Sequence, residues 1–178
     1  METIRVWAVR LAEEAAPDEV ELAPFMAESF ARGGKHRAEL LGSQESVLGG
    51  FGPTTLLVVF PTLLAGIAAA APVLLALLAA QPTSSVLDAT KNALGIVEMR
   101  MKARGLATPP PPSPLSDEAP AGFDPGELHR VISIMRRELR SAGLDADCAD
   151  ATSLRLLCAM LREPTGAADF VRQITSNL

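Results

Sequence analysis

The sequence has few of the side chains from which metal and redox sites are built. It contains two cysteines, Cys148 and Cys158, and two histidines, His36 and His129. Four-ligand zinc sites need more of these residues in closely spaced pairs. The two cysteines are therefore expected as reduced, apolar core residues, although their number also permits one disulfide. We expect neither a metal nor a cofactor.

The chain also lacks an excess of basic residues. Its 16 Lys and Arg are outnumbered by 21 Asp and Glu, and the net charge is −5. A general nucleic-acid-binding protein needs a basic surface that displaces counterions, so this class is excluded. Tyrosine is absent and lysine is scarce beside arginine. That bias is typical of a GC-rich coding sequence, most often a bacterial one.

Motifs that carry catalysis are missing as well. The glycines of 49–52 are followed by Pro53, and not by the Lys-Ser/Thr pair of a phosphate-binding loop. Asp145, Asp147 and Asp150 resemble part of a calcium loop, but its glycine and its final glutamate are missing. Helix capping by Asp147 or Asp150 explains them better. The sequence therefore predicts a protein that is not an enzyme and has no small-molecule substrate.

Charge is missing altogether from Ser46 to Leu87. The centre of this run, Leu56–Ala80, would be about 37 Å long as a helix, and a bilayer core needs about 20 such residues. A surface helix needs a polar face, so the run lies either in a bilayer or deep in a protein interior. The large apolar residues of the expected membrane segment are Leu56, Leu57, Val58, Val59, Phe60, Leu63, Leu64, Ile67, Val73, Leu74, Leu75, Leu77 and Leu78.

Two prolines leave the path of this apolar run open. Pro61 and Pro72 should kink or divide a helix. The run could be one kinked membrane span, a hairpin broken near Pro72, or a buried hairpin of a soluble protein. A chain of this size would need self-association or a partner to cover such a hairpin. If the run spans a membrane, the basic residues that follow it place the C-terminal part in the cytoplasm.

The flanks of the run are predicted to include short strands. Residues 3–11 are rich in β-branched side chains and roughly alternate, which favours a strand, and 19–22 could form a second one. A helix should start near Pro24 and stop at Gly33. Another helix should end at Gly95, and the strict alternation of 97–102 favours a strand over a continued helix. The N-terminal sequence has no signal-peptide pattern.

The C-terminal part has a different character. Residues 107–122 are rich in proline and read as an extended spacer. Residues 123–178 carry three stretches of apolar residues at helical spacing, which predict a three-helix module. We therefore divide the chain into a small α+β region (1–48), an apolar helical segment (49–106), the spacer (107–122) and the module (123–178). The predicted fold class is mainly α.

The first helix of the module carries a basic face formed by Arg136, Arg137 and Arg140. Because 123–178 contains seven Arg and eight acidic residues, this face suits a protein partner better than DNA. The sequence therefore favours a membrane-associated, non-enzymatic adaptor that presents a helical interaction module in the cytoplasm. The alternatives are a small membrane-perturbing protein of pore-forming or holin-like type, and a cytoplasmic oligomeric scaffold that buries its apolar hairpin.

Overall fold

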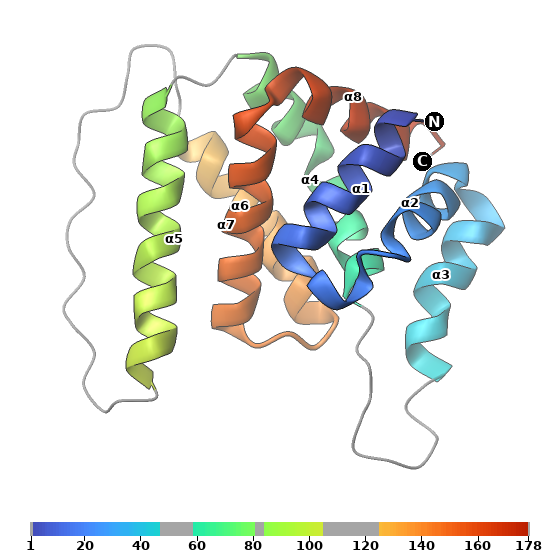
Figure 1. The fold of residues 1–178 in the computed structure, drawn as a ribbon, viewed down its shortest axis with the longest axis horizontal. Coiled ribbons are helices and arrows are strands. Elements are labelled where there is room, and N and C mark those ends of the chain that lie inside the picture. The colour runs from blue at the N-terminus through green and yellow to red at the C-terminus, as the bar shows by residue number, and fades with distance from the viewer. Residues whose placement is uncertain (1, 47–58, 81–83, 105–124, 178) are drawn as a thin grey trace.

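The chain folds into a bundle of helices, and the helices over residues 60–79 and 146–162 lie at its centre (Figure 1). The computed structural model describes residues 2–46, 59–80, 84–104 and 125–177, and no strand is present among them. The helices are α1 (Glu2–Ala15), α2 (Ala23–Arg32), α3 (Gly34–Ser46), α4 (Phe60–Ala79), α5 (Ser84–Arg104), α6 (Pro125–Ser141), α7 (Ala146–Arg162) and α8 (Pro164–Thr175), with a short 3₁₀ helix, η1 (Pro17–Glu19), after α1. The mainly helical fold class is confirmed, and its β component is wrong.

The N-terminal segment is a helix, and the strand predicted over 3–11 is wrong. The residues of α1 that are buried recur every three or four positions: Ile4, Trp7, Ala8, Leu11 and Ala12. That spacing is the period of a helix. The β-branched residues that suggested a strand include Val6, which is exposed. The strand predicted over 19–22 is also wrong, because η1 and a turn occupy these positions.

The helix predicted from Pro24 to Gly33 is confirmed as α2. Gly33 ends it with a φ of 70°, and its N–H donates to the carbonyl of Phe30. A side chain at this position would also place Cβ 2.6 Å from the carbonyl oxygen of Asn177. Glycine is therefore required both by the backbone conformation and by the close approach of the C-terminal residues. The chain continues into α3, which the sequence analysis did not predict.

The apolar run forms one continuous helix over its described part. Pro61 lies in the first turn of α4, where a missing N–H costs nothing, and Pro72 lies inside the helix. Pro72 is on the exposed side of the helix, and it removes the amide that would pair with the carbonyl of Ala68. The predicted hairpin with a break near Pro72 is therefore wrong. Leu56, Leu57 and Val58 of the predicted membrane segment lie outside the described residues.

The strand predicted over 97–102 is wrong, and the competing helix is correct. α5 passes through Gly95, the predicted stop, and ends at Arg104. Val97 and Met101, four residues apart, are half-buried, whereas Met99 between them is exposed. The alternation therefore reflects residues around a helix and not the two faces of a strand.

The three predicted C-terminal helices are confirmed as α6, α7 and α8. Gly143, with a φ of 95°, reverses the chain after α6, and the N–H of Leu144 donates to the carbonyl of Leu139. These helices pack on the earlier ones as well as on one another: α6 and α8 on α4, and α7 on α1 and α5. The predicted domain boundaries fall within 47–58 and 105–124, outside the described residues.

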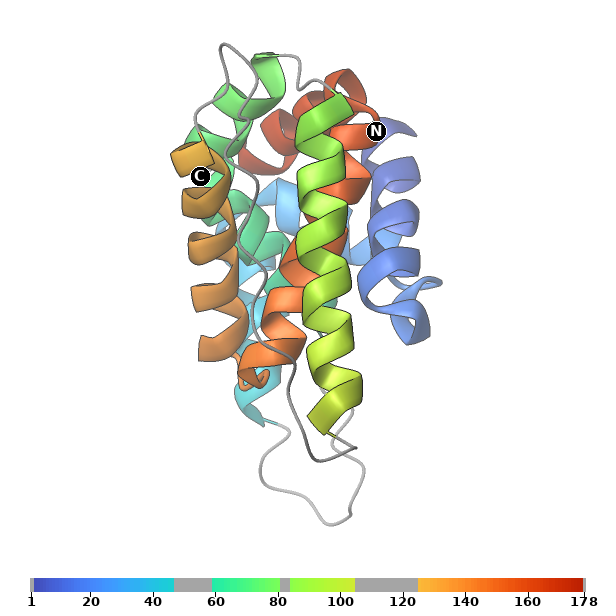
Figure 2. The same cartoon turned by 90° about the vertical axis from the view of Figure 1, so that its left-hand side faces the viewer.

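The core lies between α4 and α7 and is shared by helices from both ends of the chain. α7 is flanked by α1, α5, α6 and α8, while α4 packs against α2, α6, α8 and, less extensively, α3 (Figures 1 and 2). The largest fully buried side chains are Phe30, Phe60, Phe170, Leu11, Leu63, Leu64, Ile67, Leu74, Leu77, Met135, Leu139 and Leu156. The chain thus covers most of its apolar helix by itself, contrary to the expectation that a partner is needed.

Candidate partner-binding face

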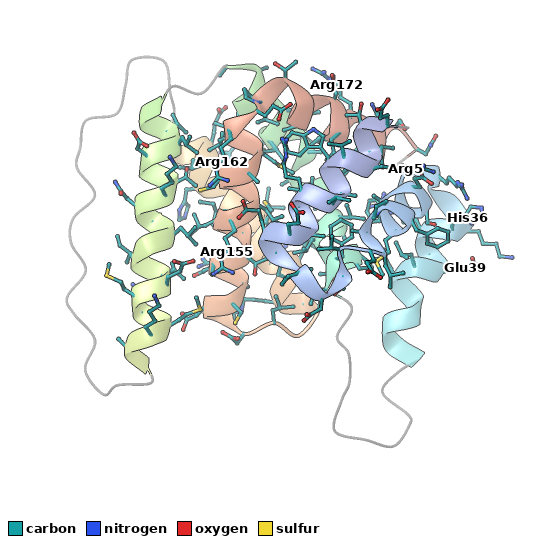
Figure 3. The ribbon with its side chains drawn as sticks, viewed as in Figure 1. Arg5, His36, Glu39, Arg155, Arg162 and Arg172 are labelled. Carbon is teal, nitrogen blue, oxygen red and sulfur yellow. The ribbon has the colours of Figure 1, made fainter. Side chains whose placement is uncertain are left out.

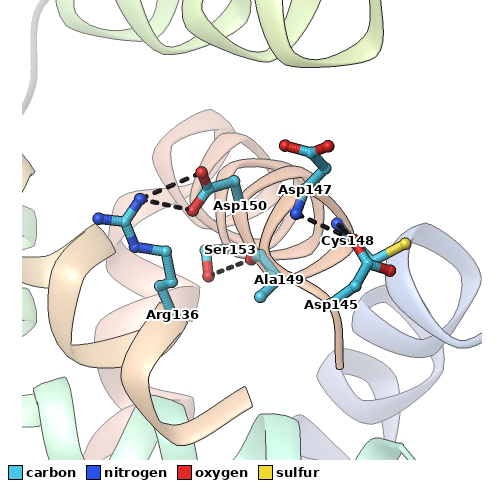
Figure 4. A network of polar contacts seen from close by, with 7 residues as sticks. All are labelled: Arg136, Asp145, Asp147, Cys148, Ala149, Asp150 and Ser153. Atoms are coloured by element: carbon cyan, nitrogen blue, oxygen red, sulfur yellow. Dashed lines mark hydrogen bonds and ion pairs between the residues drawn. The ribbon is translucent and has the colours of Figure 1, made fainter. Parts of the chain in front are cut away.

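The basic face of α6 is anchored by an ion pair with α7. The Nη1 of Arg136 donates to both carboxylate oxygens of Asp150, at 3.0 and 3.1 Å (Figure 4). The Arg136 side chain is 39% exposed and that of Asp150 is 19% exposed. A half-buried pair held by two hydrogen bonds fixes the guanidinium in one orientation. The Nε and Nη2 of Arg136 take no part in this contact.

The other two predicted arginines are more exposed. Arg137 contacts Glu138 through Nε and Nη2, both at 3.3 Å, and its side chain is 71% exposed. Arg140, one turn further along the helix, is also exposed. Together with Ser133 and Ser141, the three arginines line a shallow hollow of about 490 Å³. The structure therefore brings all three predicted residues to one face of α6.

The aspartates at the start of α7 hold the helix end that carries Asp150. The N-cap is Asp145, whose Oδ1 accepts hydrogen bonds from the N–H groups of Asp147 and Cys148, each at 3.0 Å. The prediction that Asp147 or Asp150 caps the helix is therefore wrong. A hydrogen bond with Asp145 raises the pKa of the Cys148 thiol above its usual value. The Asp150 carboxylate lies one turn further along α7.

The charges of the arginine face favour contact with anions. Guanidinium groups bind carboxylates and phosphates but do not act as bases, because they stay protonated. His36 and His129 are both exposed. Within the described residues, no group of three His, Cys, Asp or Glu side chains is placed to hold a metal ion. The arginines thus give the hollow on α6 a lining that can bind anions.

The residues predicted to lie in a membrane are mostly inside the protein. Helix α4 is long and apolar enough to cross a bilayer, but 61% of its apolar window is buried by the protein itself. Core helices of soluble proteins satisfy the same criteria of length and composition. Among the predicted residues that the structure describes, seven are buried: Phe60, Leu63, Leu64, Ile67, Leu74, Leu77 and Leu78. The other three, Val59, Val73 and Leu75, are half-buried.

Two residues that matter for this architecture were not found from the sequence. Glu19 caps α4 from a distance: its Oε1 accepts from the N–H of Val59 at 2.6 Å and its Oε2 from the N–H of Phe60 at 3.0 Å. Asp150 orients Arg136. Neither partner is close in sequence, so no local pattern indicates them.

Comparison with known proteins provides no relative for this chain. No protein-family model, no curated protein and no solved structure matches it.

Proposed function

We propose that this chain is a non-enzymatic interaction protein that binds an acidic partner protein through the arginine face of α6. The observation that carries the proposal is the fixed Arg136 beside the exposed Arg137 and Arg140, all lining one hollow. In this proposal α4 is a core helix that supports α6, because the two helices pack directly on each other.

Charge supports this choice of partner. The chain carries a net charge of −5, whereas this face has three arginines against the two carboxylates, Glu138 and Asp150, that pair with them. Oppositely charged patches steer association and select partners more than they add to affinity. The fixed Arg136 offers two remaining donor groups without a large further loss of side-chain entropy. The preferred ligand is therefore a surface rich in aspartate, glutamate or phosphate.

A labelled peptide of ten glutamates tests the proposal, with a peptide of ten glutamines as its control. We expect salt-sensitive binding to the glutamate peptide, measured by fluorescence anisotropy. The double variant R137A/R140A should bind about tenfold more weakly, because each exposed charge contact contributes at most about 1 kcal/mol. R100A removes an exposed arginine of α5 and should leave affinity unchanged. Equal weakening by R100A, or no binding preference for glutamate, would reject the proposal.

Membrane association through α4 is the second candidate function. It is favoured by the exposed side of this helix, where Ala69, Pro72 and Ala76 carry no charge or hydrogen-bonding side chain. Insertion would have to replace the burial of several Leu, Ile and Phe side chains, each contributing about 1.5–3 kcal/mol to the folded core. This cost limits the candidate to conditions that open the helical core.

Carbonate extraction of membranes separates the two candidates. If α4 is a core helix, the protein stays in the soluble fraction as a single species, and A69E/A76E changes nothing. If α4 contacts lipid, the protein remains in the membrane pellet and A69E/A76E releases it, since a charge at the bilayer centre is costly. L63D/L74D serves as the contrast, because both leucines are buried and both candidates require them.

A further inference from the structure

Helix α5 has fewer packing partners than any other long helix that the structure describes. It lies along one edge of the molecule, and its main contact is with α7 (Figures 1 and 2). Of its side chains, Val86 and Thr90 are fully buried, while Leu94 and Val97 are half-buried. Because α5 packs mainly on one helix, separating it from the rest of the fold costs less packing than separating any other long helix that the structure describes.

Val86 of α5 belongs to the main core, but part of the α7 surface beneath α5 lies outside it. Ala151, Leu154 and Cys158 are buried but do not belong to the continuous cluster of core residues. Their spacing of three and four places them on one face of α7 together with Arg155. Arg155 donates from Nη2 to Oε1 of Glu98 on α5 at 2.8 Å, and Figure 3 shows it on the side of α7 that faces α5. α5 therefore covers a small apolar strip and contributes the negative half of an ion pair.

The connections to α5 differ greatly in length. Residues 81–83 separate it from the end of the α4 segment, whereas twenty residues, 105–124, separate it from α6. Twenty residues can span at most about 70 Å, more than twice the length of a 21-residue helix. If α5 separates from α7, its N-terminal end therefore stays close to the end of α4. Its C-terminal end can move well beyond the α7 of the same chain.

We propose that α5 is exchanged between two copies of this chain, so that each α5 packs on α7 of the other copy. Exchange reuses contacts that already exist, so a second copy fits the strip of Ala151, Leu154 and Cys158 without any new interface. Glu98 then pairs with Arg155 of the other copy. The partner of this surface is thus a second copy of the chain, independently of any acidic protein bound at α6.

Reversing the charges of the Glu98–Arg155 pair tests the exchange. E98R and R155E each place like charges opposite one another. In a mixed dimer that has exchanged α5, the introduced arginine meets the introduced glutamate, and the native Glu98 meets the native Arg155. We expect native mass spectrometry of a co-refolded mixture to show a heterodimer that exceeds the homodimer of either variant several-fold. A mixture of folded variants that gives no heterodimer overturns the proposal.

The Arg5–Glu28 pair provides the matched control. It joins α1 and α2 at 2.5 Å, and neither helix has a comparable long connection on one side. A co-refolded mixture of R5E and E28R should therefore remain monomeric. A heterodimer in this control mixture would show that charge reversal alone causes association, and would also overturn the assignment.

Cys158 gives a second measurement that needs no charge reversal. It is 3% exposed beneath α5, and a C148S background removes the exposed thiol. Exchange requires α5 to separate from α7, so maleimide should label Cys158 under native conditions faster than global unfolding allows. Labelling that occurs only with global unfolding, together with a monomer at every concentration, overturns the proposal even where the charge variants do not fold.

Discussion

Helices α4 and α7 are both central and are buried to a similar extent, although their sequences differ greatly in charge. α4 has no charged residue, yet one side of it reaches the surface at Ala69, Pro72 and Ala76. α7 contains two aspartates and two arginines, yet 12 of its 17 residues are buried. Four helices pack on each of them, and 13 of the 20 residues of α4 are buried as well. Two helices of very different charge content are thus buried to a similar extent, so hydropathy alone does not set burial in this molecule.

Small and polar side chains make the enclosure of α7 possible. Ala149 and Ser153 are fully buried, and short side chains allow neighbouring helices to approach closely. The Ser153 hydroxyl donates to the carbonyl of Ala149 at 2.7 Å, so its burial leaves no unpaired polar group (Figure 4). Thr90 of α5 does the same with Val86. A helix with such residues has the sequence pattern of an amphipathic surface helix, although other helices surround it.

The strongest test of the comparison introduces aspartate into each helix. I67D in α4 and L156D in α7 each bury an unpaired charge, and we expect each to lower the free energy of unfolding by about 3–5 kcal/mol or more. A69D on the exposed side of α4 should cost about 1 kcal/mol or less. Urea unfolding followed by circular dichroism measures all three. A large loss for A69D would show that this side of α4 is also covered.

The second test removes the caps of the two helices. E19A takes the acceptor from Val59 and Phe60 at the start of α4, and D145A takes the acceptor at the start of α7. We expect each to lower the free energy of unfolding by about 1–2 kcal/mol, as capping residues do. D18A, which removes an exposed neighbour of Glu19, is the control. If E19A costs no more than D18A, the remote cap of α4 does not contribute to stability.

The smallest expected effect concerns the two thiols of α7. Burial raises the pKa of Cys158, against the opposing influence of Arg162 and Lys91, and the hydrogen bond with Asp145 raises the pKa of Cys148. The unfolded thiols, with a pKa of about 8.5, therefore ionise first, and the unfolded chain binds fewer protons. The free energy of unfolding should be constant below this range and fall as the pH rises through it.

The variants C158A and C148A show whether the two thiols cause this fall in the free energy of unfolding. Each should flatten the slope of the unfolding free energy between about pH 8 and pH 10, whatever its effect at pH 7. Urea titrations at several pH values give the slope. A slope that neither alanine variant changes would mean that other groups titrate there.

The sequence predicted elements well where apolar spacing was undisturbed. α6 and α8 have clean apolar stripes, and both were located from Val131, Met135, Phe170 and similar residues. α1 was misread because β-branched residues occupy its exposed side as well as its buried one. The arginine face was predicted, because Arg136, Arg137 and Arg140 share one side of a single helix. Its fixed geometry was not, because Asp150 reaches Arg136 only after the chain has reversed at Gly143.

The remote cap of α4 also has a consequence for the order of folding. The contact between Glu19 and Val59 spans 40 residues, and closing a loop of that length costs about 3 kcal/mol of chain entropy. The cap of α7 lies two residues from its first donor, so it can form as soon as the helix nucleates. We therefore expect α6 and α7 to pair in the folding transition state before α4 is anchored. E19A should then accelerate unfolding and leave the folding rate nearly unchanged.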